Sequence, residues 1–144
     1  KKDLARVGKK PGKTTEINFF LVNRTHYFVD LPGYGYAAPA QRDREKLRKL
    51  IIWYFTSGEV RPQKVVLILE AKAGLTRFDE EMLKILKELG YSYVVVLNKV
   101  DKLSQKEIAD TILNIRQVVD VEIFQTSTET GQGIDALREK LLPA

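Results

Sequence analysis

The chain has 144 residues, of which 44% are hydrophobic and 30% charged, so it carries enough apolar side chains for one globular core. It contains no cysteine, which excludes disulfide bonds, thiolate metal sites and a cysteine nucleophile, and favours a reducing compartment. No apolar run approaches the roughly 20 residues of a membrane span, and the N-terminus does not read as a signal peptide. We therefore expect a soluble cytoplasmic protein with no membrane partner.

The net charge of +5 is concentrated at the N-terminus. Lys1 to Lys13 contain six Lys or Arg and one Asp, whereas the rest of the chain is balanced. Such a segment can bind an RNA backbone by releasing counterions, or it can be a solvated segment without a partner. Composition leaves both interpretations open.

Two β-rich runs come first in the chain. Residues 17–23 and 26–31, separated by a short polar turn, predict an antiparallel hairpin. Apolar side chains then recur at helical spacing from Leu47 to Phe55, and Gly58 is the expected end of that helix.

Two stronger apolar runs follow, at residues 65–69 and 91–97. Near-continuous apolar runs are typical of parallel strands that are buried on both faces. The helix expected between them has Thr76 as its N-cap and Gly90 as its terminator.

The last part of the chain predicts a helix, a strand and a second helix. Ser104 and Glu107 have capping-box spacing, and isoleucines then recur on one helical face. A strand over residues 121–126 and a helix over 134–142 follow. This alternation predicts an α/β fold with a mostly parallel sheet.

Three short motifs each follow the end of a predicted strand. D-L-P-G at residues 30–33 matches the D-x-x-G turn that senses the γ-phosphate and metal, N-K-V-D at 98–101 matches the N-K-x-D loop that reads guanine, and T-S-T at 126–128 would back the base. Ligands of doubly wound sheets bind beyond the carboxyl ends of the strands. We therefore expect three loops that converge on a guanine-nucleotide site at one sheet edge.

The side chains of these motifs suit GTP and GDP. The Asp101 carboxylate can accept hydrogen bonds from the ring N–H and the exocyclic amine of guanine, a donor pair that adenine lacks. Asn98 would brace the loop, and Lys99 would pack its stem over the base. Asp30 would hold Mg²⁺ through water, while the Gly33 N–H would reach the γ-phosphate. The plainer alternatives are a turn capped by Asp101 and an ordinary Pro-Gly turn.

The sequence has no G-x-x-x-x-G-K-[ST] phosphate loop. Gly8 to Thr14 resembles one, but only three residues separate its first two glycines, no strand precedes it, and an extended run follows where a helix must begin. We interpret this segment as the first switch loop, in which the Thr14 hydroxyl would coordinate magnesium when triphosphate is bound. The alternative is a basic loop without that role.

The K-P-G-K-T stretch at residues 10–14, I-N-F-F at 17–20 and D-L-P-G-Y-G-Y-A at 30–37 occur in an order that resembles the EngB family of bacterial ribosome-assembly GTPases, also called YihA or YsxC. The resemblance runs from Lys1 to the C-terminus. It implies the three-layer P-loop GTPase fold, with one antiparallel edge hairpin on a mostly parallel sheet. It also implies GTP and GDP binding with Mg²⁺, a role in maturing the large ribosomal subunit through its RNA and proteins, and a link to cell division and septation.

The chain departs from the family in two places. Asn98 stands where the family usually has threonine, which brings it closer to the general GTPase pattern. The family's first strand, phosphate loop and first helix would all precede Lys1. In the family's sheet that strand lies between the strand that ends at Asp30 and the one that begins at Val65. We therefore expect residues 1–144 to form one GTPase domain that lacks this part of the fold and has two open strand edges.

Tyr34 follows Gly33, where many small GTPases have the glutamine that orients the attacking water. We therefore expect slow hydrolysis that needs a partner such as the ribosome, and whether the chain as given is an enzyme stays open.

The other hypothesis is a non-catalytic RNA-binding or interaction module that keeps the fold. The basic helix from Arg42 to Lys49 is equally compatible with a solvated face and with an RNA-facing one.

The expected site consists of residues from four segments, and we expect the protein to be a monomer. The residues expected to bind nucleotide are Gly12, Lys13, Thr14, Thr15, Glu16, Asp30, Leu31, Pro32, Gly33, Asn98, Lys99, Val100, Asp101, Thr126, Ser127 and Thr128, with Thr14 and Asp30 as magnesium ligands and no catalytic side chain assigned.

Overall fold

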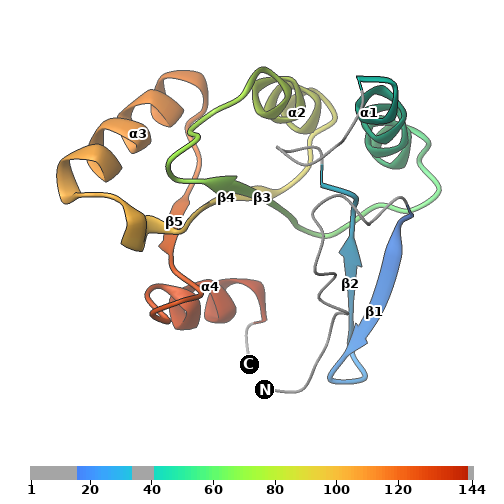
Figure 1. Cartoon of the computed structure of the whole chain (residues 1–144). Coiled ribbons are helices and arrows are strands. Elements are labelled where there is room, and N and C mark those ends of the chain that lie inside the picture. The colour runs from blue at the N-terminus through green and yellow to red at the C-terminus, as the bar shows by residue number, and fades with distance from the viewer. Residues whose placement is uncertain (1–15, 34–40, 143–144) are drawn as a thin grey trace. The chain divides into compact units, whose positions relative to one another are not determined.

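The computed structural model describes residues 16–33 and 41–142. The chain divides into two units, Lys1–Arg61 and Pro62–Ala144. In the described residues, the first unit holds a hairpin and a helix, and the second holds a parallel sheet with helices on both faces (Figure 1).

The hairpin consists of β1 (Asn18–Val22) and β2 (His26–Asp30), which pair antiparallel as predicted. Asn23 and Arg24 form the turn with φ angles of 52° and 61°. Left-handed backbone at a hairpin turn matches the twist of the strands, and asparagine tolerates it well. The short connection thereby sets the register of the hairpin.

One face of the hairpin is apolar and exposed. Phe19, Leu21 and Tyr27 have exposed fractions of 52%, 54% and 69%, and the register places them on the same face. β2 pairs with β1 along one edge, and no other strand within residues 16–33 and 41–142 pairs with its second edge. The hairpin therefore presents both an apolar face and free backbone groups.

Helix α1 (Gln41–Thr56) follows, where the apolar periodicity predicts it. One stripe of its surface is buried, at Leu47, Ile51, Tyr54 and Phe55. The helix ends two residues before Gly58, whose φ of 73° suits glycine and few other residues.

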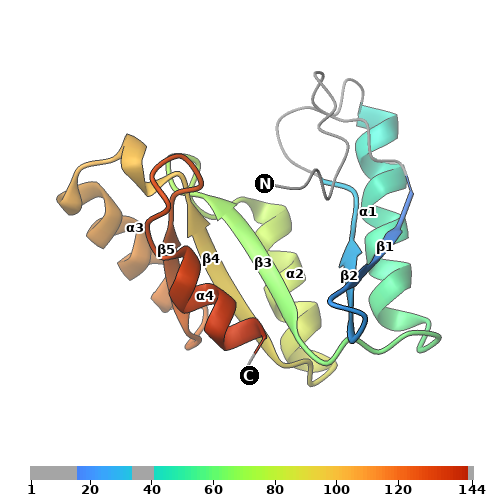
Figure 2. The same cartoon turned by 90° about the horizontal axis from the view of Figure 1, so that it is seen from below.

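The second unit is a three-stranded parallel sheet in the order β3-β4-β5. Helices α2 and α3 cover one face of the sheet and α4 lies on the other, as both views show (Figures 1 and 2). The α/β class, with a parallel sheet and an antiparallel hairpin, is confirmed. The elements are β3 (Val65–Glu70), α2 (Arg77–Glu88), β4 (Tyr93–Asn98), a 3₁₀ turn η1 (Val100–Lys102), α3 (Gln105–Val118), β5 (Ile123–Thr126) and α4 (Ile134–Leu141).

The expectation that both strong apolar runs are buried on two faces holds for only one of them. β4 is the central strand, and Val95 and Leu97 are fully buried. In β3 the burial alternates, and Ile68 is 64% exposed. The prediction is wrong for β3 because α4, the helix on the second face of the sheet, packs against β5 and leaves one face of β3 uncovered (Figure 1).

Both predicted helix caps are confirmed. Thr76 accepts a hydrogen bond from the Asp79 N–H at 3.2 Å, and Gly90 follows α2 with a φ of 68°. Ser104 accepts from the Glu107 N–H at 3.3 Å, while the Ser104 N–H donates to the Glu107 carboxylate at 2.7 Å. The Ser104 hydroxyl also donates to the Glu107 carboxylate at 2.7 Å, and this hydrogen bond, followed by the one from the Ser104 N–H, holds the pKa of Glu107 below its ordinary value.

We expect Ser104→Ala to lower the free energy of unfolding by about 1 kcal/mol, because it removes a side-chain acceptor from the first turn of α3. Urea unfolding followed by circular dichroism measures this change. The matched control is Ser92→Ala, an exposed serine with no side-chain hydrogen bond to another described residue, which should change stability by less than about 0.5 kcal/mol. Equal losses for the two variants would contradict a capping role.

Candidate functional site

Polar side chains lie side by side where the three parallel strands end. In the register of the sheet, Glu70 of β3 pairs with Asn98 of β4, and Asn98 pairs with Thr126 of β5. Two of the three sequence motifs therefore meet at the carboxyl edge of the sheet, as predicted. This edge positions the loops that follow.

The N-K-V-D loop turns sharply after β4. Lys99 has left-handed backbone, with φ 62° and ψ 35°, which redirects the chain into η1. The Lys102 N–H then donates to the Lys99 carbonyl at 3.1 Å, and Val100 is 2% exposed. The buried Val100 side chain anchors the loop in the core, which leaves Asp101 at the sheet edge.

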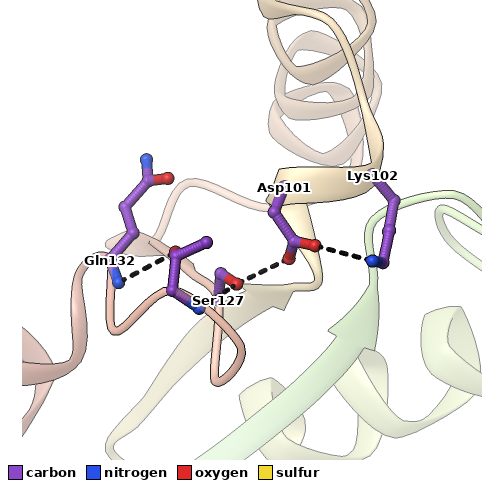
Figure 3. A network of polar contacts seen from close by, with 5 residues as sticks. Asp101, Lys102, Ser127 and Gln132 are labelled. Carbon is purple, nitrogen blue, oxygen red and sulfur yellow. Dashed lines mark hydrogen bonds and ion pairs between the residues drawn. The ribbon is translucent and has the colours of Figure 1, made fainter.

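The Asp101 carboxylate is held from two sides (Figure 3). The Ser127 hydroxyl donates to Oδ1 at 2.6 Å, and Lys102 Nζ lies 3.1 Å from Oδ2. The hydrogen bond from Ser127 is the largest cause that lowers the pKa of Asp101, with Lys102 adding to it against partial desolvation. Asp101 is therefore a carboxylate at neutral pH, and it does not cap α3, whose N-cap is Ser104.

The loop after β5 places Ser127. The Ser127 N–H donates to the Gln132 carbonyl at 3.0 Å, and the Ser127 carbonyl accepts from the Gly131 N–H at 2.8 Å. The Thr130 N–H donates to Ser127 Oγ at 3.2 Å. Ser127 is fully buried, so these bonds hold its hydroxyl toward Asp101.

Gly133 closes this loop at a place where a side chain has no room. It has a φ of 69°, and a Cβ there would lie 2.0 Å from the Gln125 carbonyl oxygen. The sequence motifs do not single out Gly133 or Gln132. The spacing G-Q-G just before a helix is the signal for a tight turn.

A second pair braces the two loops. Thr126 Oγ1 donates to Asn98 Oδ1 at 3.2 Å, and the Thr126 side chain is almost fully buried. Asn98, which we expected to brace its own loop, thus accepts a hydrogen bond from the T-S-T motif. The two loops are linked through Asn98 with Thr126 and through Asp101 with Ser127.

Lys99 has a partner that the sequence motifs do not reveal. Its Nζ lies 2.9 Å from Glu70 Oε2, and the two side chains are 54% and 50% exposed. An ion pair this exposed contributes little to stability. The ion pair matters for position instead, because the Glu70 carboxylate at the end of β3 holds the Lys99 side chain of the N-K-V-D loop toward that strand. In the sequence, the signal for this pair is the acidic residue Glu70, which follows the apolar run at residues 65–69.

Apart from Thr128, the other expected site residues lie in the first unit or outside the described residues. Asp30 ends β2 and is exposed, Leu31 is partly buried, Pro32 is buried and Gly33 is exposed. Glu16 is exposed, and its carbonyl accepts from the Asn18 amide at 3.5 Å. Thr128 is exposed in the loop after β5. Gly12, Lys13, Thr14, Thr15 and Tyr34 lie outside the described residues.

Asp30 is the one expected magnesium ligand that the structure describes. Among residues 16–33 and 41–142, no three His, Cys, Asp or Glu side chains gather closely enough to hold a metal ion. Magnesium in nucleotide sites is held by one or two protein oxygens together with phosphates and water. An exposed carboxylate at a strand end fits that limited role.

We expect Ser127→Ala to raise the pKa of Asp101, because the largest cause of its lowered pKa is removed. A carboxylate with a lowered pKa stabilises the folded state above its unfolded pKa, and this contribution is lost as pH falls through the folded pKa. In Ser127→Ala the loss should begin at a higher pH. NMR titration of the Asp101 carboxyl carbon measures the shift, with Lys102→Gln as the matched control. A larger shift in Lys102→Gln would contradict the assignment to Ser127.

A family model described as ferrous iron transport protein B matches residues 2–141. Curated relatives named probable GTP-binding protein EngB match nearly the whole chain. The protein from Aquifex aeolicus is 36% identical over 140 residues, which cover 96% of this chain and 76% of the relative. The protein from Thermosipho africanus is 37% identical, with 96% and 72% covered.

Solved structures agree on the fold. A crystal structure of a probable GTP-binding protein EngB matches with a TM-score of 0.74 at 21% identity, over 88% of this chain and 79% of that one. Era, crystallised with MgGDPNP and nucleotides 1506–1542 of 16S ribosomal RNA, matches with a TM-score of 0.72 at 21% identity, over 96% of this chain and 47% of Era. At these identities the likeness concerns the fold alone.

Proposed function

This chain belongs to the EngB family of GTP-binding proteins, and on that premise we propose that it is a guanine-nucleotide switch that acts in assembly of the large ribosomal subunit, with a link to cell division. The identities of 36% and 37% over nearly the whole chain assign the family. We therefore take GTP binding as the basis of the proposed function.

The observation that carries the proposal is the ionised Asp101 carboxylate at the carboxyl edge of the sheet. Guanine presents its ring N–H and exocyclic amine side by side, and a carboxylate has two oxygens to accept them. Ser127 and Lys102 already hold the carboxylate in one orientation. The site is therefore preorganised for a pair of donors, and adenine, which lacks that pair, would be rejected.

Magnesium belongs to the proposal as the partner of the phosphates. Asp30 would hold it through water, and Thr14 would add a hydroxyl ligand when triphosphate is bound. Bound magnesium would neutralise charge on the β- and γ-phosphates. Gly33, exposed three residues after Asp30, would offer its N–H to the γ-phosphate.

The proposed partner is the ribosomal RNA of the large subunit, met by a monomer in the cytoplasm. No helix in the described part of the chain is long and apolar enough to cross a membrane. The net charge of +5 favours an anionic partner. Hydrolysis is proposed to be slow until the ribosome assists it, because tyrosine stands at position 34.

A second candidate is a non-catalytic RNA-binding module that keeps the GTPase fold. The observation that favours it is the basic segment from Lys1 to Lys13, which contains six Lys or Arg and one Asp and can bind an RNA backbone by releasing counterions.

Titration with fluorescent guanine and adenine nucleotides tests the proposal. We expect the chain as given to bind GTP weakly or not at all, and a version with an EngB first strand and phosphate loop placed before Lys1 to bind GTP and GDP in preference to ATP. Micromolar GTP binding by the chain as given would contradict the first expectation. Failure of the restored version to prefer guanine would favour the RNA-binding module.

A further inference from the structure

Helix α1 carries a basic stripe that the nucleotide site does not use. Arg42, Lys46, Lys49 and Trp53 are spaced four, three and four residues apart, which places them on one side of a helix. All four are exposed. We call these four residues the basic stripe. Buried Leu47, which is five residues after Arg42, and the other core residues of α1 lie on the opposite side of the helix.

The three cations of the basic stripe are available to an outside partner. Arg42, Lys46 and Lys49 form no ion pair or side-chain hydrogen bond with another residue in the described part of the chain. Glu45, the nearest acid in sequence to Lys46, pairs instead with Arg48 at 3.4 Å. The stripe is therefore positive along its length.

Trp53 adds an aromatic surface at the end of the basic stripe. Its exposed fraction is 48%, so about half of a large aromatic side chain faces solvent. From Arg42 to Trp53 the stripe spans roughly 16 Å, because a helix rises 1.5 Å per residue. That length can follow several phosphates of a nucleic acid strand.

We propose that the basic stripe binds single-stranded RNA, with Arg42, Lys46 and Lys49 on the phosphates and one unpaired base stacked on Trp53. Cations that track a backbone beside an aromatic stacking platform are the chemistry of single-strand recognition. A duplex fits less well, because its base faces are already stacked and cannot reach Trp53. The inference rests on the proposed function for the source of the RNA, which would be an unpaired ribosomal segment.

An acidic protein surface is the competing partner. It would satisfy the three cations but would offer no base to Trp53, and the basic stripe has no second large apolar side chain for a protein interface to bury. The observations therefore favour RNA, and the competing partner becomes an outcome of the test.

Trp53 makes a direct test possible because it is the single tryptophan of the chain. The full chain, without nucleotide, is titrated with a single-stranded oligouridylate, a duplex RNA and polyglutamate while tryptophan fluorescence is recorded. We expect quenching by the single strand, little by the duplex, and little by polyglutamate. Quenching by polyglutamate as strong as by RNA would assign the stripe to an acidic protein and overturn the proposal.

Charge variants locate the phosphate contacts. The variant Arg42→Gln, Lys46→Gln, Lys49→Gln removes three charges, and its matched control removes three exposed charges from the second unit. The logarithmic salt slope should fall by about 2 in the stripe variant, at about 0.7 per phosphate contact, and stay unchanged in the control. The same fall in both variants would overturn the proposal. The control substitutions are Lys84→Gln, Lys106→Gln and Arg116→Gln.

Substitution of Trp53 tests stacking separately from charge. Trp53→Ala should weaken binding of a labelled oligouridylate roughly ten-fold, as read by fluorescence anisotropy, and Trp53→Phe should restore part of the loss. Equal affinity in Trp53→Ala and in the unsubstituted chain would refute stacking. Because these titrations contain no nucleotide, their failure leaves the guanine-nucleotide proposal standing, and failure of nucleotide binding leaves the RNA result unchanged.

Discussion

Asp101→Asn is expected to abolish tight GDP binding and to create binding of xanthosine diphosphate. The amide replaces one acceptor oxygen with a donor, so a donor faces a donor of guanine and the loss should be on the order of a hundred-fold or more. Xanthine has a carbonyl where guanine has its exocyclic amine. The amide can donate to that carbonyl, while its oxygen still accepts the ring N–H.

The experiment needs the version with a restored phosphate loop, so that the affinity before substitution is high. Dissociation constants for GDP and xanthosine diphosphate are measured by fluorescent-nucleotide competition. The matched control is Asp110→Asn, the same chemical change at an exposed residue of α3, which should alter neither constant. Intact GDP binding in Asp101→Asn would make Asp101 a structural residue, held by Ser127 for the sake of the loop alone.

Gly133→Ala is expected to lower the free energy of unfolding by about 3 kcal/mol, combining left-handed backbone with a steric clash. The new Cβ would lie 2.0 Å from the Gln125 carbonyl oxygen, and a backbone atom cannot rotate away as a side chain can. The loop must therefore shift. Because Ser127 is held by the Gln132 carbonyl next to Gly133, we also expect the hydrogen bond from Ser127 to Asp101 to be disturbed.

Gly131→Ala is the matched control for the clash. Gly131 has a φ of 84°, but a Cβ there would have nothing within 4 Å. Its cost should be about 1 kcal/mol, from left-handed backbone alone. Urea unfolding gives both values. If the two variants lost the same stability, the close approach at Gln125 would have no energetic consequence.

Much of the fold follows from local pattern. Helices α2 and α3 begin where Thr76 and Ser104 provide caps, and the apolar periodicity from Leu47 to Phe55 lies within α1, which begins earlier, at Gln41. Capping and periodicity depend on residues at most a turn apart, so no tertiary information is needed to recognise them. Burial of β3 did not follow in this way, because Ile68 is as apolar as its buried neighbours and is exposed only because α4 packs against β5 instead.

The sequence by itself determined the motifs, the family and the residue types of the base-reading loop, because these depend on side-chain chemistry at fixed spacing. Only the tertiary structure decided which of these residues touch. Lys99 pairs with Glu70 across 29 positions, Thr126 with Asn98 across 28, and Ser127 with Asp101 across 26. Strand register creates these contacts by setting Glu70, Asn98 and Thr126 side by side, and register is a property of paired strands that no single segment carries.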